Sequence, residues 1–226
     1  MKSPLHAKFV LAAAAALVCL LPVRAQDLAA LATPWPVVLE KPIVACRVEN
    51  PTTLVMSAPA NSNIFLSPDG GFNQDSAPRV LFKPEGPFIL TAKIQPEFHE
   101  KWDAGVLLLY NDAEHYAKFC YEADYRMTPR IVSVVCNERG DDCNSAPVPE
   151  GAVYYRIAGS STKESFALYA SADGRSWFLI RTFRLTRTDN LRVGFSAQSP
   201  AGKGCTVRFS EIRVERRDVK DFWNGD

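Results

Sequence analysis

Residues 115–124 could place several ligand-binding groups on one side of a β-strand. The segment reads His-Tyr-Ala-Lys-Phe-Cys-Tyr-Glu-Ala-Asp. Successive side chains of a strand point to opposite faces, so the polar and aromatic members of this segment would share one face. They are Tyr116, Lys118, Cys120, Glu122 and Asp124. The alternate side chains are apolar and would belong to the core. Charged side chains in the middle of a sheet are costly unless they are paired or lie in a solvated groove.

The segment before it predicts a partner strand. Residues 105–110, Gly-Val-Leu-Leu-Leu-Tyr, are apolar on both faces, which is typical of a central strand that is covered on each side. The polar residues 111–114 would connect the two strands as a β-hairpin. If the residues that flank this connection pair with each other, Asp103 lies opposite Glu122. Lys118 would then have a carboxylate on either side.

Two interpretations of this polar patch stay open. It could be a lysine–carboxylate network that only solvates one face of the sheet. It could alternatively line a groove, where carboxylates and Lys118 bind sugar hydroxyls while Tyr116 and Trp102 stack on the apolar face of a sugar ring. Arg181 is added because it shares a strand face with Trp177 and could stack on it. The candidate ligand-binding residues are Trp102, Asp103, Tyr116, Lys118, Glu122, Asp124 and Arg181.

No catalytic signature accompanies these residues. Retaining glycoside hydrolysis uses two carboxyl groups about 5–5.5 Å apart, which Asp103 and Glu122 could supply across the two strands. The glucanase-type pattern Glu-x-Asp-x-x-Glu is incomplete here, because Met127 stands where the pattern has its last Glu. The chain has no Gly-x-Ser-x-Gly motif, and neither His99 nor His115 has an evident nucleophilic partner. We therefore expect no catalytic residues, with hydrolysis by the two carboxyl groups as the alternative.

The cysteines predict one disulfide and no metal site. Cys46, Cys120, Cys136, Cys143 and Cys205 follow the N-terminal segment, and an oxidising compartment would favour pairing of some of them. Cys136 and Cys143 flank a polar turn, so we predict a bridge between them and at least one free thiol. Zinc is the weaker alternative, because no Cys-x-x-Cys pair exists. An acidic pair in the same turn is more typical of a solvated turn than of a calcium site. We expect no cofactor.

Residues 1–25 have the pattern of a secretory signal peptide. A basic start precedes the apolar residues 9–21, which are too few to span a bilayer, and small residues surround the predicted cleavage site after Ala25. We therefore expect a secreted or periplasmic protein. A lipoprotein anchored through Cys19 is the alternative, although the residues before it lack the small side chain that such processing prefers. No later segment is apolar over the ~20 residues of a membrane span.

The charge balance argues against a polyanionic partner. The chain has 26 Lys and Arg residues against 25 Asp and Glu residues, a formal net charge of +1. No cluster of basic residues interrupts this balance, so binding to nucleic acid or anionic lipid is not expected. The expected partner is a carbohydrate or another small polar ligand.

The elements that would position these side chains are strands. From Ile43 onward, about a dozen short β-type runs alternate with turn residues, and no helical period lies between them. This pattern predicts an all-β fold of two packed antiparallel sheets. Asp173-Gly174 between two such runs predicts a hairpin. We expect residues 26–43 to be an extended lead-in, residues 44–215 to form the β-sandwich, and residues 216–226 to be a polar tail.

Several segments, in this order, resemble the DUF1349 family. They are residues 102–108, 115–122, 169–177, Arg181 and residues 193–200. That family is similar to the regulation-of-enolase protein, and the resemblance implies a concanavalin A-like lectin/glucanase jelly roll over roughly residues 60–215. The family has no settled activity, so the resemblance implies a fold and a groove more than a ligand.

We therefore expect an exported, non-catalytic β-sandwich that binds a carbohydrate through the polar patch. The first alternative is a glycoside hydrolase-like enzyme that uses Asp103 and Glu122. The second is a structural or protein-interaction module of the cell envelope.

Overall fold

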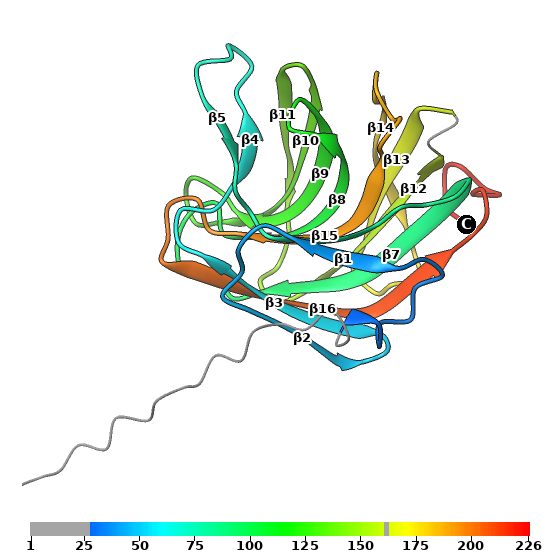
Figure 1. Ribbon diagram of the computed structural model, residues 1–226, viewed down its shortest axis with the longest axis horizontal. Helices are drawn as coiled ribbons and strands as arrows, with labels where there is room; N and C mark the ends of the chain where they lie inside the picture. Colours follow the sequence, from blue (N-terminus) through cyan, green and yellow to red (C-terminus); the bar gives the residue numbers. More distant parts are fainter. Residues whose placement is uncertain (1–27, 161–162) are drawn as a thin grey trace, which may run out of the picture.

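The computed structural model describes residues 28–160 and 163–226 and shows an all-β sandwich (Figure 1). Two antiparallel sheets of seven strands each pack face to face, and a small two-stranded hairpin stands on one of them. The predicted signal peptide, residues 1–25, and Cys19 within it lie outside the described residues. Among the described residues, no helix is both long and apolar enough to cross a membrane.

The strand order confirms the prediction of two antiparallel sheets. Sheet A consists of β1 (Val37–Glu40), β6 (Arg79–Phe82), β15 (Arg192–Gln198), β8 (Ala104–Asp112), β9 (His115–Ala123), β10 (Pro129–Asn137) and β11 (Gly140–Pro147). Sheet B consists of β14 (Phe178–Arg184), β13 (Ser165–Ser171), β12 (Val153–Ser160), β7 (Pro87–Pro96), β16 (Gly204–Glu215), β3 (Thr53–Pro59) and β2 (Ala45–Asn50). The hairpin consists of β4 (Ile64–Leu66) and β5 (Asn73–Asp75). The doubly apolar strand β8 is central, as predicted, and part of the expected lead-in forms β1 at the edge of sheet A.

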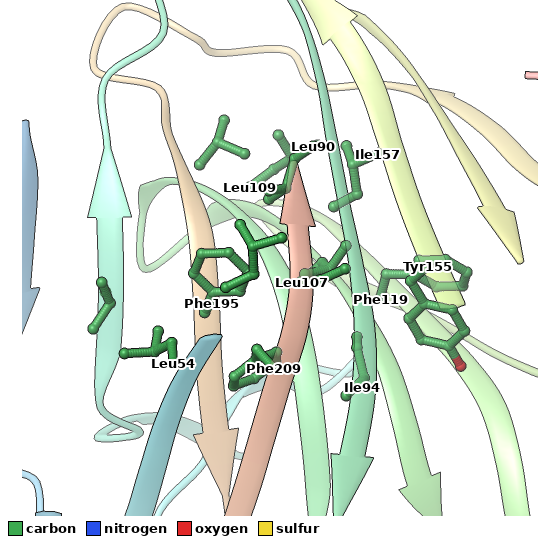
Figure 2. Close-up of a cluster of buried hydrophobic side chains, with 14 of the residues drawn as sticks. Leu54, Leu90, Ile94, Leu107, Leu109, Phe119, Tyr155, Ile157, Phe195 and Phe209 are labelled. Atoms are coloured by element: carbon green, nitrogen blue, oxygen red, sulfur yellow. The ribbon is translucent and has the colours of Figure 1, made fainter. Parts of the chain in front are cut away.

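Side chains from both sheets meet in one hydrophobic core, part of which Figure 2 shows. Leu107 and Phe119 reach it from sheet A, and Tyr155 and Phe209 reach it from sheet B. The rings of Phe119 and Tyr155 stack with their centroids 3.8 Å apart. Burying one large apolar side chain stabilises a fold by about 1.5–3 kcal/mol. This inward row therefore orients β9 strongly, so its alternate side chains face away from sheet B.

The alternation of side chains along β9 confirms the predicted division into two faces. Ala117, Phe119 and Tyr121 belong to the core between the sheets. Tyr116 and Cys120 belong instead to a second apolar cluster on the side of sheet A that is turned away from sheet B. We call this side the outer face of sheet A.

The register between β8 and β9 differs by one residue from the prediction. Ala104, rather than Asp103, lies opposite Glu122. The turn is tighter than predicted, because Asp112 rather than Tyr110 pairs with His115. This alone would shift the register by two residues, and a β-bulge at Asn111 takes back one of them. The Asn111 side chain accepts a hydrogen bond from the backbone N–H of Asn190, at 2.8 Å. A contact with a distant segment thus accompanies the bulge.

The structure contradicts the predicted disulfide. Both Cys136 and Cys143 are free thiols, the first buried and the second exposed. In the β10–β11 hairpin Cys136 pairs with Gly140, whereas Cys143 pairs with Ser133. The two cysteines are therefore about 10 Å apart along the strands and point to opposite faces of the sheet. A disulfide requires Cα atoms within about 7 Å of each other.

The β4–β5 hairpin lies over the outer face of sheet A, beside β10 and β11 (Figure 1). The backbone N–H of Leu66 donates a hydrogen bond to the Tyr116 hydroxyl, at 2.9 Å. At Gly140 an added Cβ would lie 2.1 Å from the Leu66 carbonyl oxygen. Glycine is therefore required where β11 approaches the hairpin. These contacts hold the hairpin as a wall above the polar side chains of β9.

The tail packs on the opposite side of the molecule. The Tyr169 hydroxyl donates a hydrogen bond to the carbonyl oxygen of Phe222, at 2.7 Å. The Arg156 guanidinium donates to the Gly225 carbonyl and forms an ion pair with Asp226, at 3.3 Å. Residues 216–226 thus lie against the outer face of sheet B and leave the polar side of sheet A uncovered.

Candidate functional site

A cavity of about 570 Å³ lies between the outer face of sheet A and the β4–β5 hairpin. Its volume is within the range of about 300–1,000 Å³ that is typical of small-molecule sites. The hairpin and its flanks contribute Asn61, Asn63, Phe65, Phe72 and Gln74. Strands β9, β10 and β11 contribute Lys118, Glu122, Val132, Val134, Asp142 and Asn144. The remaining lining residues are Trp102, Tyr125, Gln198 and Pro200.

The register of sheet A builds the floor of this cavity. Lys118 pairs with Val134, which pairs in turn with Asp142 on β11. One row further along, Val132 pairs with Asn144. Polar groups thus stand on β9 and β11, and the two valines of β10 lie between them. Such a floor can bind the polar edge and the apolar face of one ligand at the same time.

Lys118 is the only lysine of the cavity lining, and it is 3 % exposed. Its ammonium group donates hydrogen bonds to the side-chain oxygens of Gln198, at 3.2 Å, and Asn63, at 3.5 Å. The Phe65 ring lies 5.5 Å from the same nitrogen. Asn63 and Phe65 come from the β4 segment and Gln198 from β15, so the site exists only in the folded sandwich.

Gln198 connects the two charged residues that the sequence placed on one face. Its amide oxygen accepts the hydrogen bond from Lys118, and its amide nitrogen donates to Glu122, at 3.3 Å. The same nitrogen donates to the backbone oxygen of Trp102, at 3.1 Å. Both ends of the amide are therefore engaged, which orients Glu122 and the Trp102 backbone relative to Lys118.

The two carboxyl groups of the cavity hold their protons more strongly than usual. Burial raises the pKa of Glu122 to about 8, against the opposing effect of Lys118. At neutral pH Glu122 is therefore largely protonated and can donate a hydrogen bond. Burial also raises the pKa of Asp142, while Lys118 and Arg181 act to lower it. The sequence predicted Asp142 only as part of a solvated turn, so its place in the cavity is a new finding.

Aromatic rings surround the polar groups. Phe65 lines the cavity from the hairpin, and Phe72, Trp102 and Tyr125 are partly open to solvent, with 49 %, 40 % and 60 % of their surface exposed. Trp102 has a φ of 68°, an unfavourable conformation for a bulky residue. Its backbone N–H donates to the Ala123 carbonyl, at 2.6 Å, which holds this conformation. The strained backbone presents the indole ring at the cavity mouth.

Asp103 does not line the cavity. It is fully buried and accepts hydrogen bonds from the Ser199 hydroxyl, at 2.6 Å, and from the backbone N–H groups of His99 and Glu100, both at 2.9 Å. Both carboxylate oxygens are thus used to hold a loop. The structure does not place Asp103 and Glu122 together as a pair of carboxyl groups facing one ligand.

Tyr116 and Asp124 also lie outside the cavity lining. Tyr116 is buried under the hairpin, and burial raises the pKa of its hydroxyl well above the usual range. Asp124 holds the turn after β9, where it accepts hydrogen bonds from two backbone N–H groups and from the Arg130 guanidinium, at 2.9 Å. Burial alone would raise the pKa of Asp124, but these donors together lower it. Both residues support the walls of the site.

Arg181 connects the two sheets at their edge. From β14 of sheet B it donates to the Ser133 hydroxyl, at 3.2 Å, and forms an ion pair with Asp141, also at 3.2 Å. Trp177 has a different partner, because the guanidinium carbon of Arg156 lies 4.0 Å from its ring centroid. The stacking on Trp177 that was considered for Arg181 is thus made by Arg156.

Sequence reasoning missed several cavity residues. Gln198, Asn63 and Phe65 come from segments far from β9, and Asp142 comes from the hairpin that we expected to carry a disulfide. Only the parity of β11 could have indicated that Asp142 and Asn144 share one face. Among the described residues, no group of three or more His, Cys, Asp or Glu side chains is arranged to hold a metal ion.

The comparison with protein families identifies the class of this chain. The sequence model of the DUF1349 family, described as "Protein of unknown function", matches residues 42–217. The chain therefore belongs to this family. Among curated proteins, none matches the chain.

Solved structures share the fold at low sequence identity. A functionally unknown protein from Saccharomyces cerevisiae superposes with a TM-score of 0.72 at 18 % identity, covering 79 % of this chain and 95 % of its own. A GH43 protein from Bacillus licheniformis gives a TM-score of 0.60 at 14 % identity over 76 % of this chain and 35 % of its own. A xylan β-1,4-xylosidase from Bacillus halodurans gives 0.59 at 16 % identity over 75 % and 34 %. The chain thus spans about a third of the length of these two larger proteins. A polysaccharide lyase of family 18 gives 0.51 at 10 % identity over 79 % and 93 %.

Proposed function

We propose that this protein is a non-catalytic carbohydrate-binding sandwich and that the cavity on the outer face of sheet A is its binding site. The observation that carries the proposal is one cavity lined by aromatic rings together with an ammonium, two carboxyl groups and several amides. Sugars present hydroxyl groups around their edge and C–H groups on their ring faces. Hydrogen-bonding side chains serve the first, and aromatic rings serve the second.

The fold neighbours support this class of ligand without defining it. They include a xylosidase and a polysaccharide lyase, which act on carbohydrates. The site residues support it independently, because Gln198 positions Lys118 and Glu122 on the same floor. Trp102 also lines the cavity and is 40 % exposed.

Calorimetric titration with a panel of soluble neutral and acidic oligosaccharides tests the proposal. We expect at least one to bind, and we expect Trp102→Ala to weaken binding roughly two- to tenfold through the loss of ring contact. Phe178→Ala is the matched control, because Phe178 is an exposed aromatic residue that does not line the cavity. Its affinity should equal that of the wild type.

Two results would contradict the proposal. One is the absence of binding to every glycan of the panel, which would favour a protein-interaction module. The other is unchanged binding by a Lys118→Ala, Glu122→Ala double variant, which would place any sugar site elsewhere.

A second candidate is a glycoside hydrolase or lyase, and the raised pKa of Glu122 favours it. A general acid must carry a proton at the working pH, and Asp142 supplies a second carboxyl group in the same cavity. Asp142 thus takes the place that the sequence suggested for Asp103. Release of reducing ends from the same panel, lost in Glu122→Gln, would support catalysis. Absence of release leaves the binding function.

We propose further that the protein is secreted or periplasmic. The support is the sequence pattern of residues 1–25, with a basic start, a short apolar run and small residues near Ala25. N-terminal sequencing of the exported protein should find Gln26 as its first residue. Recovery of uncleaved protein in the cytoplasmic fraction would contradict export.

A further inference from the structure

Lys118 is a buried cation whose contacts are neutral. Its side chain lines the cavity, and its ammonium group contacts the amide oxygens of Gln198 and Asn63 and the ring of Phe65. None of the ion pairs among residues 28–160 and 163–226 includes Lys118. Taking a charge out of water without an opposite charge at contact distance is costly. An anion bound in the cavity beside the Lys118 ammonium group would therefore supply the missing opposite charge.

The carboxyl groups nearby do not remove this demand. Glu122 is largely protonated at neutral pH, because burial raises its pKa to about 8. Asp142 stands two strands from Lys118 in the register, so their backbones are about 10 Å apart. The negative charge of Asp142 is also close enough to Arg181 to be influenced by it. Asp142 is thus shared between two cations and does not form an ion pair with Lys118 alone.

We propose that the cavity selects an acidic sugar, a hexuronic acid unit of an oligosaccharide, and that the Lys118 ammonium group binds its carboxylate. The inference rests on the proposed carbohydrate binding and specifies the class of sugar. A carboxylate of the ligand supplies the opposite charge at contact distance, and the resulting hydrogen bond is about twice as strong as one between neutral groups. Asn63 then binds a neighbouring hydroxyl group, Gln198 keeps Lys118 and Glu122 in place, and protonated Glu122 donates to an oxygen of the sugar.

The test compares pairs of ligands that differ only in charge. The purified protein is titrated by calorimetry with short oligouronates and with the same oligosaccharides after methyl esterification of their carboxyl groups. Esterification keeps the ring and the hydroxyls and removes the negative charge. We expect the wild type to bind at least one acid at least about tenfold more tightly than its ester.

Two variants assign this preference to Lys118. Lys118→Gln removes the charge and keeps a hydrogen-bonding group, and it should reduce the ratio of the two affinities to less than about twofold. Lys93→Gln is the matched control. Lys93 lies on sheet B, where its ammonium group is 3.9 Å from Glu211, and its loss should leave the ratio unchanged.

The outcomes separate this inference from the function on which it rests. Equal affinities of the wild type for every acid and its ester overturn the selection of acidic sugars and leave carbohydrate binding in place. An unchanged ratio in a folded Lys118→Gln variant overturns the role of Lys118. Failure of every acidic and neutral sugar to bind overturns both proposals. The wild-type ratio decides the selectivity even if the variant does not fold, which thermal unfolding would reveal.

Discussion

Two buried cations on the outer face of sheet A have opposite surroundings. Arg79 is 2 % exposed and donates to the carboxylates of Glu40, at 3.1 Å, and Asp75, at 3.2 Å. Its guanidinium carbon also lies 3.9 Å from the ring centroid of Tyr110. Lys118 is equally buried, yet its hydrogen-bond partners are amides. The sheet thus neutralises one cation with the protein's own acids and leaves the other in a cavity.

The difference distinguishes a cation that stabilises the fold, Arg79, from a cation that remains able to bind a ligand, Lys118. The Arg79 network joins β1, β5 and β6, so it anchors the hairpin that forms the cavity wall. Breaking such a pair leaves an uncompensated buried charge. Among the residues that the structure describes, no carboxylate is paired with Lys118 at contact distance, so replacing Lys118 does not leave an unpaired buried charge. Three measurements test this contrast.

The largest effect is expected at Arg79. Arg79→Met should lower the free energy of unfolding by about 3–5 kcal/mol, because Asp75 and Glu40 lose their buried partner. Denaturant unfolding measures it. Lys41→Met is the control, because Lys41 pairs with the same Asp75 from a more exposed position and should cost no more than about 1 kcal/mol. Similar losses in the two variants would contradict the structural role of Arg79.

Glu122 should give a smaller, pH-dependent effect. Burial raises its pKa from 4.5 to about 8 in the folded protein, with Lys118 opposing the shift and Asp142 and Asp124 reinforcing it. Between these pH values the folded state holds a proton that the unfolded state has released. The stability contributed by Glu122 is therefore fully present below about pH 4.5 and is lost as the pH rises through about 8.

The measurement is denaturant unfolding of the wild type and Glu122→Gln between about pH 6 and pH 8. The wild type should lose on the order of 2 kcal/mol relative to the variant over this range, because glutamine does not titrate. Parallel stability curves would show that Glu122 titrates normally and lies in a wetter environment than the structure indicates.

The smallest stability effect is expected at Lys118. Lys118→Met should change the free energy of unfolding by no more than about 1 kcal/mol, in either direction, because replacing a buried charge with an apolar side chain of similar length is often neutral. Urea unfolding at neutral pH provides the comparison with Arg79→Met. A loss as large as that of Arg79→Met would refute the contrast between the two cations.

The pattern of residues determined much of this arrangement in advance. The alternation in residues 115–123 predicted that Phe119 faces the core and that Lys118 and Glu122 share the other face, and the contacts confirm both. The doubly apolar run of β8 predicted a central strand. These predictions succeed because the period of two of an extended chain is local and because burial acts on each apolar side chain separately.

Predictions that needed exact register were less successful. The tighter turn between Asp112 and His115, only partly offset by the bulge at Asn111, places Ala104 rather than Asp103 opposite Glu122. The Asn111 side chain contacts Asn190, which lies far along the chain. The spacing of Cys136 and Cys143 suggested a bridge across a turn, but their pairing places them on opposite faces. A change of one residue in register reverses the face of every side chain, so spacing alone predicts such contacts poorly.

The sequence by itself determined an all-β chain with two faces per strand and a polar set on one of them. Only the tertiary structure decided that this set becomes a cavity, because the wall comes from the β4–β5 hairpin, Gln198 comes from β15, and Asp142 comes from β11. Local periodicity is a property of neighbouring residues, whereas the burial and charge environment of Lys118 arise from segments that meet only when both sheets have formed.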